Sequence, residues 1–231
     1  RLLYSTQRLV SMAISVALVM FSAIVHEVAH GWMALRLGDP TAKEAGRLTL
    51  DPRAHLDGFG SIVLPLIMAA MGGPVFAFAK PVPYDPRRLR HPGKDDALVA
   101  LAGPVSNILQ ALLGTALVYA VWNLGYGAVV AGNVPYEALF WAMRVCTTYV
   151  YVNLTLAFFN LIPLPPLDGS KLLLPLLRGK AKMEYYRIQH YAMPILLILL
   201  YVLPEFLGVD PLGAFLDLTA GNLYDLLLSG V

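Results

Sequence analysis

Long runs of apolar residues dominate the chain and give the first structural prediction. They cover residues 9–35, 60–79, 97–122, 138–162 and 188–207. Each run can cross, or nearly cross, a hydrocarbon core that requires about 20 residues of helix. A soluble protein of this size breaks such runs with polar stripes. The pattern predicts an all-α polytopic membrane protein with four to five transmembrane helices in a single domain, residues 1–231. The tail 210–231 is predicted as an interfacial amphipathic helix or a last membrane turn.

The second run, residues 60–79, is a poor uninterrupted helix. It contains Pro65 and the sequence Gly-Gly-Pro at 72–74, and basic residues flank both of its ends. Strand-like pieces lie on either side, at 47–50 and 75–82. Such backbone is tolerated at membrane depth only where protein or a water-filled cavity satisfies its hydrogen bonds. We expect a re-entrant or short β element between the first two core helices. An ordinary cytoplasmic loop is the alternative.

Composition and charge support the membrane assignment and add an orientation. Hydrophobic residues make up 58% of the chain and charged residues only 14%, against about a quarter charged in soluble domains. Nine Lys and Arg residues lie between Arg36 and Lys94, and five between Lys171 and Arg187. The positive-inside rule places these basic regions in the cytoplasm and the 123–137 loop outside. A net charge of +2 gives no nucleic-acid footprint.

Residues 26–30 read HEVAH, a His-Glu-x-x-His motif inside the first apolar run. On a helix, positions i and i+4 project from one face, so His26 and His30 can bind a single metal ion. Glu27 is then placed to act as a general base. The alternative is a polar helix interface that satisfies all three side chains. Ionisable residues at membrane depth are costly and indicate function by default, so the motif predicts a metal site.

A catalytic zinc ion needs a third protein ligand and an open position. The candidates are Glu44, His55, Asp57, His91, Asp168 and His190. Glu44 and Asp57 lie beyond the helix end, where soluble metalloproteases often have this ligand. Asp168 ends the segment LIPLPPLDG directly after the 138–162 run, which places it at the rim of the membrane. Its alternative role is the N-cap of a helix over 170–177. The residues themselves leave this choice open.

The combination of HEVAH at 26–30 with FNLIPLPPLDG at 159–169 resembles the site-2 protease family of intramembrane zinc metalloproteases. AGPVSN at 102–107 is similar to the Gly-Pro-x-x-Asn stretch of the family's intervening core helix. GDPTAKEAGRLTLDP and AKPVPYDPRRLR resemble the compact bacterial branch, which lacks PDZ and CBS domains. The resemblance implies that Asp168 is the third zinc ligand. It also implies that Asn160, Pro163 and Asn107 occupy substrate-binding positions.

The function implied by the resemblance is hydrolysis of peptide bonds within or near the bilayer, with Zn²⁺ as cofactor and Glu27 as general base. The expected partners are a transmembrane protein or peptide substrate and the lipid bilayer, and the expected location is a prokaryotic plasma membrane. Helix–helix hydrogen bonding is the alternative role for Asn160, and packing is the alternative for Asn107. Two other functions compete: a catalytically silent zinc-binding scaffold, and a transporter, which usually has paired repeats.

Overall fold

The computed structural model of the protein describes residues 2–56 and 80–231. In chain order its elements are α1 (Leu2–Arg36), α2 (Thr41–Glu44), α3 (Pro52–His55), η2 (Pro86–Arg88), α5 (Lys94–Val130), α6 (Tyr136–Asn160), α7 (Asp168–Leu173), η3 (Leu174–Leu176), α8 (Lys180–His190), α9 (Ala192–Leu197), η4 (Ile198–Val202), α10 (Leu203–Leu207), α11 (Pro211–Leu216), η5 (Asp217–Gly221) and α12 (Asn222–Leu227). Here η2 and η3 are 3₁₀ helices, and η4 and η5 are π-helical turns.

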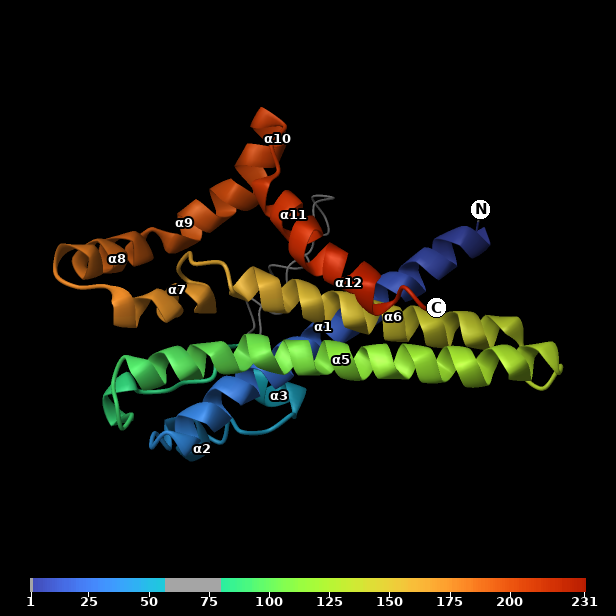
Figure 1. Ribbon diagram of the computed structural model, residues 1–231, viewed down its shortest axis with the longest axis horizontal. Helices are drawn as coiled ribbons and strands as arrows, with labels where there is room; N and C mark the ends of the chain where they lie inside the picture. Colours follow the sequence, from blue (N-terminus) through green and yellow to red (C-terminus); the bar gives the residue numbers. More distant parts are fainter. Residues whose placement is uncertain (1, 57–79) are drawn as a thin grey trace.

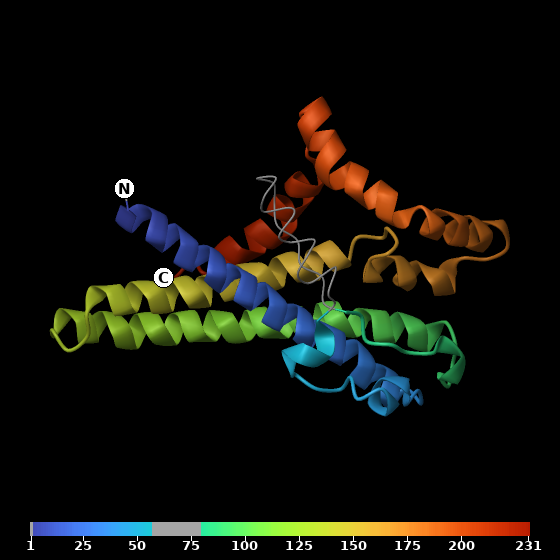
Figure 2. The ribbon, with the colours of Figure 1, turned by 180° about the vertical axis from the view of Figure 1, so that it is seen from behind.

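Three long helices form the centre of the molecule. Helices α5 and α6 lie side by side and run in opposite directions, and α1 crosses them obliquely (Figures 1 and 2). The α5–α6 interface is closed by buried small and branched side chains, including Ala111, Val118, Val150 and Leu154. The predicted helices at 9–35, 97–122 and 138–162 are therefore present in the structure.

Two of these helices are long and apolar enough to cross a membrane, α1 from Thr6 onward and α5. Helix α8 and the segment Pro194–Phe206 add a third candidate only if this pair, bent by 71°, is one span. Helix α6 has 25 residues but is not among these candidates. Residues 2–56 and 80–231 thus give two candidate spans, or up to three, and the four to five predicted spans are not confirmed.

The short β element is not confirmed either. Within residues 2–56 and 80–231 the structure has no strand, and residues 47–50 are irregular, with bends at 48 and 49. The re-entrant segment 60–79, and most of the piece at 75–82, lie outside the described residues.

The structure corrects the predicted loop at 123–137. Helix α5 continues to Val130, so the connection to α6 spans only 131–135. The reason is packing: a Cβ atom at Gly125 would lie 2.6 Å from Leu139 Cδ1, so the two helices approach closely beyond the end of the apolar run. The connection itself turns at Gly132, whose φ of +74° favours glycine.

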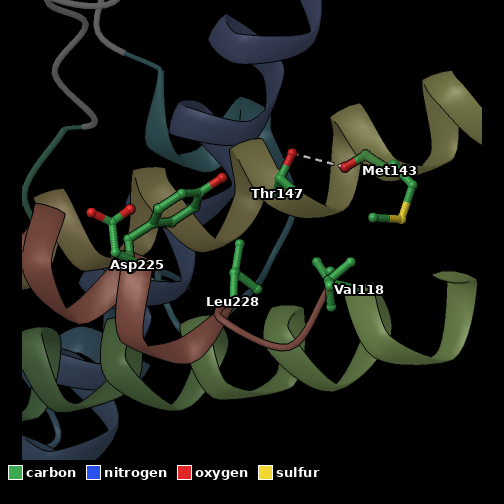
Figure 3. A pocket seen from close by; sticks show the side chains of 7 residues that line it. Val118, Met143, Thr147, Asp225 and Leu228 are labelled. Atoms are coloured by element: carbon green, nitrogen blue, oxygen red, sulfur yellow. Dashed lines mark hydrogen bonds between the residues drawn. The ribbon is translucent and has the colours of Figure 1, made fainter.

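The C-terminal region also differs from one continuous helix over 188–207. The chain bends through α8, α9, η4 and α10 and then folds back, so that α11, η5 and α12 lie along α6 (Figure 1). Beside α12 is a cavity of about 370 Å³ (Figure 3). It is lined by Val118, Met143, Thr147, Tyr224, Asp225, Leu228 and Val231. None of the predicted site residues lines this cavity.

Asp39 links the two polar loops beyond the end of α1. Its fully buried carboxylate accepts hydrogen bonds from the Asp85 N–H, at 2.5 Å, and from the Thr41 N–H, at 3.0 Å. The Thr41 hydroxyl also donates to it. One side chain thus holds the 80–93 segment against the α1–α2 turn.

Asp39→Ala is expected to lower the free energy of unfolding by about 1–3 kcal/mol, because the partly buried N–H groups of Thr41 and Asp85 lose their acceptor. Thermal unfolding in detergent measures the change. Asp51→Ala is the control: among the described residues this partly exposed carboxylate accepts only from Arg53, two positions along the chain, so its loss should lower the unfolding temperature less than Asp39→Ala does. Equal effects of the two substitutions would contradict the role assigned to Asp39.

Candidate metal centre

Helix α1 brings His26 and His30 together on one face, as the i, i+4 spacing predicts. Their Nε2 atoms are 3.0 Å apart. Asp168 Oδ2, which comes from the start of α7, lies 3.0 Å from His26 Nε2 and 3.2 Å from His30 Nε2. The three residues are 6%, 7% and 9% exposed, so the cluster is buried. Residues 142 positions apart in sequence thus meet at one point.

The turn between α6 and α7 determines where the Asp168 carboxylate points. Leu167, not Asp168, is the N-cap of α7, and Asp168 makes no capping bond, so the predicted N-cap role is wrong. A Cβ atom at Gly169 would lie 2.1 Å from the Leu161 carbonyl oxygen and 2.6 Å from that of Ile162. The turn therefore packs directly on the Gly169 backbone. Any other residue would displace the turn that holds Asp168.

The other described candidates for a third ligand lie elsewhere. Glu44 pairs with Arg88 at the surface, at 3.1 Å. His55 is fully buried, and its Nε2 lies 2.7 Å from the Thr49 carbonyl oxygen. His91 and His190 are exposed. Asp57 lies outside the described residues.

Hydrogen-bond partners on the far side of each ring indicate which nitrogen is protonated. His30 Nδ1 lies 2.7 Å from the Val99 carbonyl oxygen, which can only accept, so Nδ1 carries the hydrogen and Nε2 has a lone pair. His26 Nδ1 lies 2.6 Å from Asn107 Oδ1, which favours the same tautomer. Three acceptor atoms, two Nε2 and Asp168 Oδ2, therefore converge. Such a group repels itself unless a cation lies between its members.

The spacing of these acceptors suits zinc. A tetrahedral ion with bonds of about 2.0–2.1 Å holds its ligand atoms about 3.3 Å apart, close to the observed 3.0–3.2 Å. Gly103 on α5 provides the space: a Cβ atom there would lie 2.4 Å from His30 Nε2 and 2.5 Å from His26 Nε2. The absent side chain leaves open the position that an ion bound to both histidines requires.

The charge of Asp168 also suits a metal ligand. Burial raises the pKa of this carboxyl group, but in the metal-free site, imidazolium groups of His26 and His30, which donate to it, lower the pKa more strongly, to below its usual range. The group is ionised at neutral pH, which is the form in which a carboxylate binds a metal.

Glu27 lies beside the cluster. A carboxylate oxygen of Glu27 and ligand nitrogens of both histidines are all within 4.8 Å of one another. Glu27 Oε2 accepts a hydrogen bond from the Val82 N–H at 2.9 Å. The buried Arg47 guanidinium holds the adjacent backbone by donating to the Lys80 carbonyl oxygen at 2.6 Å. Arg47 and Val82 give no sequence signal for this role, because nothing in the local pattern links them to Glu27.

The three predicted substrate-binding residues have different surroundings. Asn160 Nδ2 donates to the Leu156 carbonyl oxygen of its own helix, at 2.9 Å, and Pro163 is exposed. Asn107 is fully buried and contacts His26. Substrate binding by these residues stays a prediction. The contact of Asn107 with His26 instead indicates that Asn107 orients a candidate zinc ligand.

Comparisons with known proteins agree with this chemistry. Residues 137–203 match the model of Peptidase family M50. The chain is 34% identical over 215 residues to "Putative zinc metalloprotease YwhC" of Bacillus subtilis (strain 168), covering 93% of this chain and 88% of that protein. It is 28% identical to "Putative zinc metalloprotease Rip2" of Mycolicibacterium smegmatis over 181 residues, 78% of this chain and 64% of that protein. No solved structure matches the chain significantly.

The fold and the site therefore define a helical metalloprotease. The chain belongs to peptidase family M50, the site-2 protease family of zinc metalloproteases.

Proposed function

We propose that the protein hydrolyses peptide bonds of transmembrane protein or peptide substrates within or near the bilayer, at a zinc ion held by His26, His30 and Asp168. The observation that carries the proposal is the convergence of the two Nε2 atoms and Asp168 Oδ2 within 3.0–3.2 Å. Along the helix axis, His30 lies about 9 Å and His26 about 15 Å before the end of α1 at Arg36. Because α1 is a candidate span, this depth supports a site below the membrane surface.

The chemistry divides between the metal and the chain. Zinc, when bound, supplies Lewis acidity toward the scissile carbonyl group. Glu27 acts as general base: it takes a proton from the attacking water and delivers it to the leaving amine. The Val82 N–H holds Oε2 of Glu27 at 2.9 Å, which leaves Oε1 for the transferred proton. Asn160 uses one N–H on the Leu156 carbonyl oxygen, and its second N–H is available to a substrate oxygen.

Two features argue against a catalytically silent scaffold. Structural zinc is normally closed by four protein ligands, whereas three described ligand atoms converge here. Glu27 is also intact and oriented by a backbone donor. We further propose an integral, multi-pass protein of a prokaryotic plasma membrane, supported by the apolar helices α1 and α5 and by the compact bacterial pattern of the sequence.

The test uses the purified chain in lipid vesicles with a transmembrane peptide, and mass spectrometry locates the products. We expect cleavage within the apolar segment, loss of cleavage with a chelator and recovery with zinc. Asp168→Ala should weaken zinc binding by more than about 100-fold, because one of three ligands is removed. Glu44→Ala, the matched carboxylate control, should keep zinc and activity. Cleavage of soluble peptides alone, or full activity of Asp168→Ala, would contradict the proposal.

A further inference from the structure

We infer that Asn153 is a positioning residue for His26: through Asn107, it fixes which ring nitrogen of His26 is free to bind zinc. The inference rests on the zinc site proposed above. Its basis is a buried chain of hydrogen bonds that begins at a backbone carbonyl group of α6 and ends at the His26 ring.

The chain of contacts joins three helices. Asn153 Nδ2 donates to the Tyr149 carbonyl oxygen at 2.9 Å and to Ser22 Oγ at 3.0 Å. Asn107 Nδ2 donates to Asn153 Oδ1 at 2.9 Å, and Asn107 Oδ1 lies 2.6 Å from His26 Nδ1. Ser22, Asn107 and Asn153 are each 0% exposed. Water is therefore not available to replace any of these bonds.

The direction of every bond follows from the first one. A backbone carbonyl oxygen can only accept, so the amide nitrogen of Asn153 must face Tyr149. The amide oxygen of Asn153 then faces Asn107 and requires a donor there. This orients the Asn107 amide with its nitrogen toward Asn153 and its oxygen toward His26. His26 must therefore carry its hydrogen on Nδ1, and its Nε2 presents a lone pair to the metal position.

The opposite orientation would be harmful. If the Asn107 amide turned over, its NH₂ group would face His26 Nδ1 and make that atom the acceptor. The hydrogen would then be on Nε2, directed at His30 and Asp168, where the ion must bind. His30 needs no such relay, because the Val99 carbonyl oxygen fixes its tautomer directly at 2.7 Å. The two histidines thus reach the same tautomer by different routes.

Asn153→Leu tests the relay, because leucine removes both polar atoms at similar size. The Asn107 amide is then free to turn, and we expect zinc affinity to fall by about 10- to 100-fold. Competition with a chromophoric zinc chelator in detergent measures the affinity. The matched control is Gln110→Leu. Gln110 is a buried amide one turn from Asn107, and its Oε1 accepts from the Tyr149 hydroxyl group. The relay uses only the backbone carbonyl group of Tyr149, so zinc affinity should not change.

A second substitution should restore the affinity. Aspartate at position 107 has two acceptor oxygens, so it accepts from His26 Nδ1 in either orientation. It does not need a hydrogen bond from Asn153 to orient it. The double variant Asn107→Asp, Asn153→Leu is expected to bind zinc within about threefold of wild type, as a carboxylate–histidine–zinc arrangement. Damage to packing alone would not be repaired in this way. Ser22→Ala should also stay near wild type, since the Tyr149 carbonyl group still orients Asn153.

The outcomes separate this inference from the proposed function. A wild-type protein that binds no zinc would overturn the site and the inference together. Zinc binding by wild type with unchanged affinity in Asn153→Leu, or no recovery in the double variant, would overturn the relay alone. Where leucine is not accommodated, Asn153→Ala replaces it, with the same loss and the same recovery expected.

Discussion

Gly103→Ala is expected to eliminate zinc binding, and with it all hydrolysis, while the protein stays folded. The added Cβ atom would lie 2.4 Å from His30 Nε2 and 2.5 Å from His26 Nε2. Zinc binds histidine nitrogen at about 2.0–2.1 Å, so the methyl group and the ion compete for nearly the same position. Elemental analysis of the purified variant should find far less than one zinc per chain, and peptide cleavage should fall to the rate measured with chelator.

Gly127→Ala is the matched control on the same helix. Apart from the local backbone of its own helix, no heavy atom of the described residues lies within 4 Å of a Cβ atom at Gly127, so the methyl group meets open space. Alanine in a helix interior is favoured over glycine by up to about 1 kcal/mol, and the unfolding temperature should be unchanged or slightly higher. Zinc content and activity should equal those of wild type. A Gly103→Ala protein that keeps a full zinc ion would show that the ion lies away from the point where the two Nε2 atoms converge.

Glu27→Gln is expected to keep zinc but to lower the rate of hydrolysis by about 10²- to 10⁴-fold, the usual contribution of a general base. Glutamine has the same shape and retains a side-chain oxygen for the Val82 N–H. The side chain at position 27 is not one of the three proposed zinc ligands, His26, His30 and Asp168, whose ligand atoms are 3.0–3.2 Å apart. Glutamine cannot, however, take a proton from water. Zinc analysis and single-turnover cleavage, measured on the same preparation, separate the two roles.

Glu44→Gln provides the comparison, because Glu44 is exposed and pairs only with Arg88 among the described residues. It should match wild type in both measurements. Loss of zinc in Glu27→Gln would make Glu27 a ligand rather than the base. An undiminished rate in Glu27→Gln would place the base at another residue.

The local parts of the site follow from the sequence. The i, i+4 spacing of His26 and His30 fixes their common face on any helix, and the apolar run around them predicts that helix. Asp168 is different, because helix periodicity carries no information across 142 residues. Only the resemblance selected it over Glu44 and Asp57, and the structure brings its carboxylate to the histidines.

The supporting residues were not predictable in the same way. Gly103 lies beside the histidines, and Asn153 beside Asn107, because packing of all three helices fixes how far α5 and α6 are shifted along α1. Nothing in the neighbouring sequence of Asn153 indicates a contact with Asn107, and an isolated glycine in an apolar helix has many uses. Asn107 was identified by its motif, but as a substrate-binding residue. Its contact with His26 depends on the same packing.

The fold shows the same division. Hydrophobic runs predicted the central helices, because length and apolarity are local properties. They did not predict that α5 continues to Val130, since this extension depends on contact between Gly125 and Leu139 of the neighbouring helix. The bends between α8 and α10 were missed for a related reason, since an apolar run does not distinguish a straight helix from a broken one.

The distance in sequence between the candidate ligands also bears on biosynthesis. His26 and His30 leave the ribosome early, but Asp168 follows His26 by 142 residues. A partly synthesised chain therefore carries only two of the three proposed ligands. The metal site cannot be complete until α6 and the turn before α7 have been made and packed against α1. On the proposed assignment, a nascent chain is expected to be proteolytically inactive until most of the bundle has assembled.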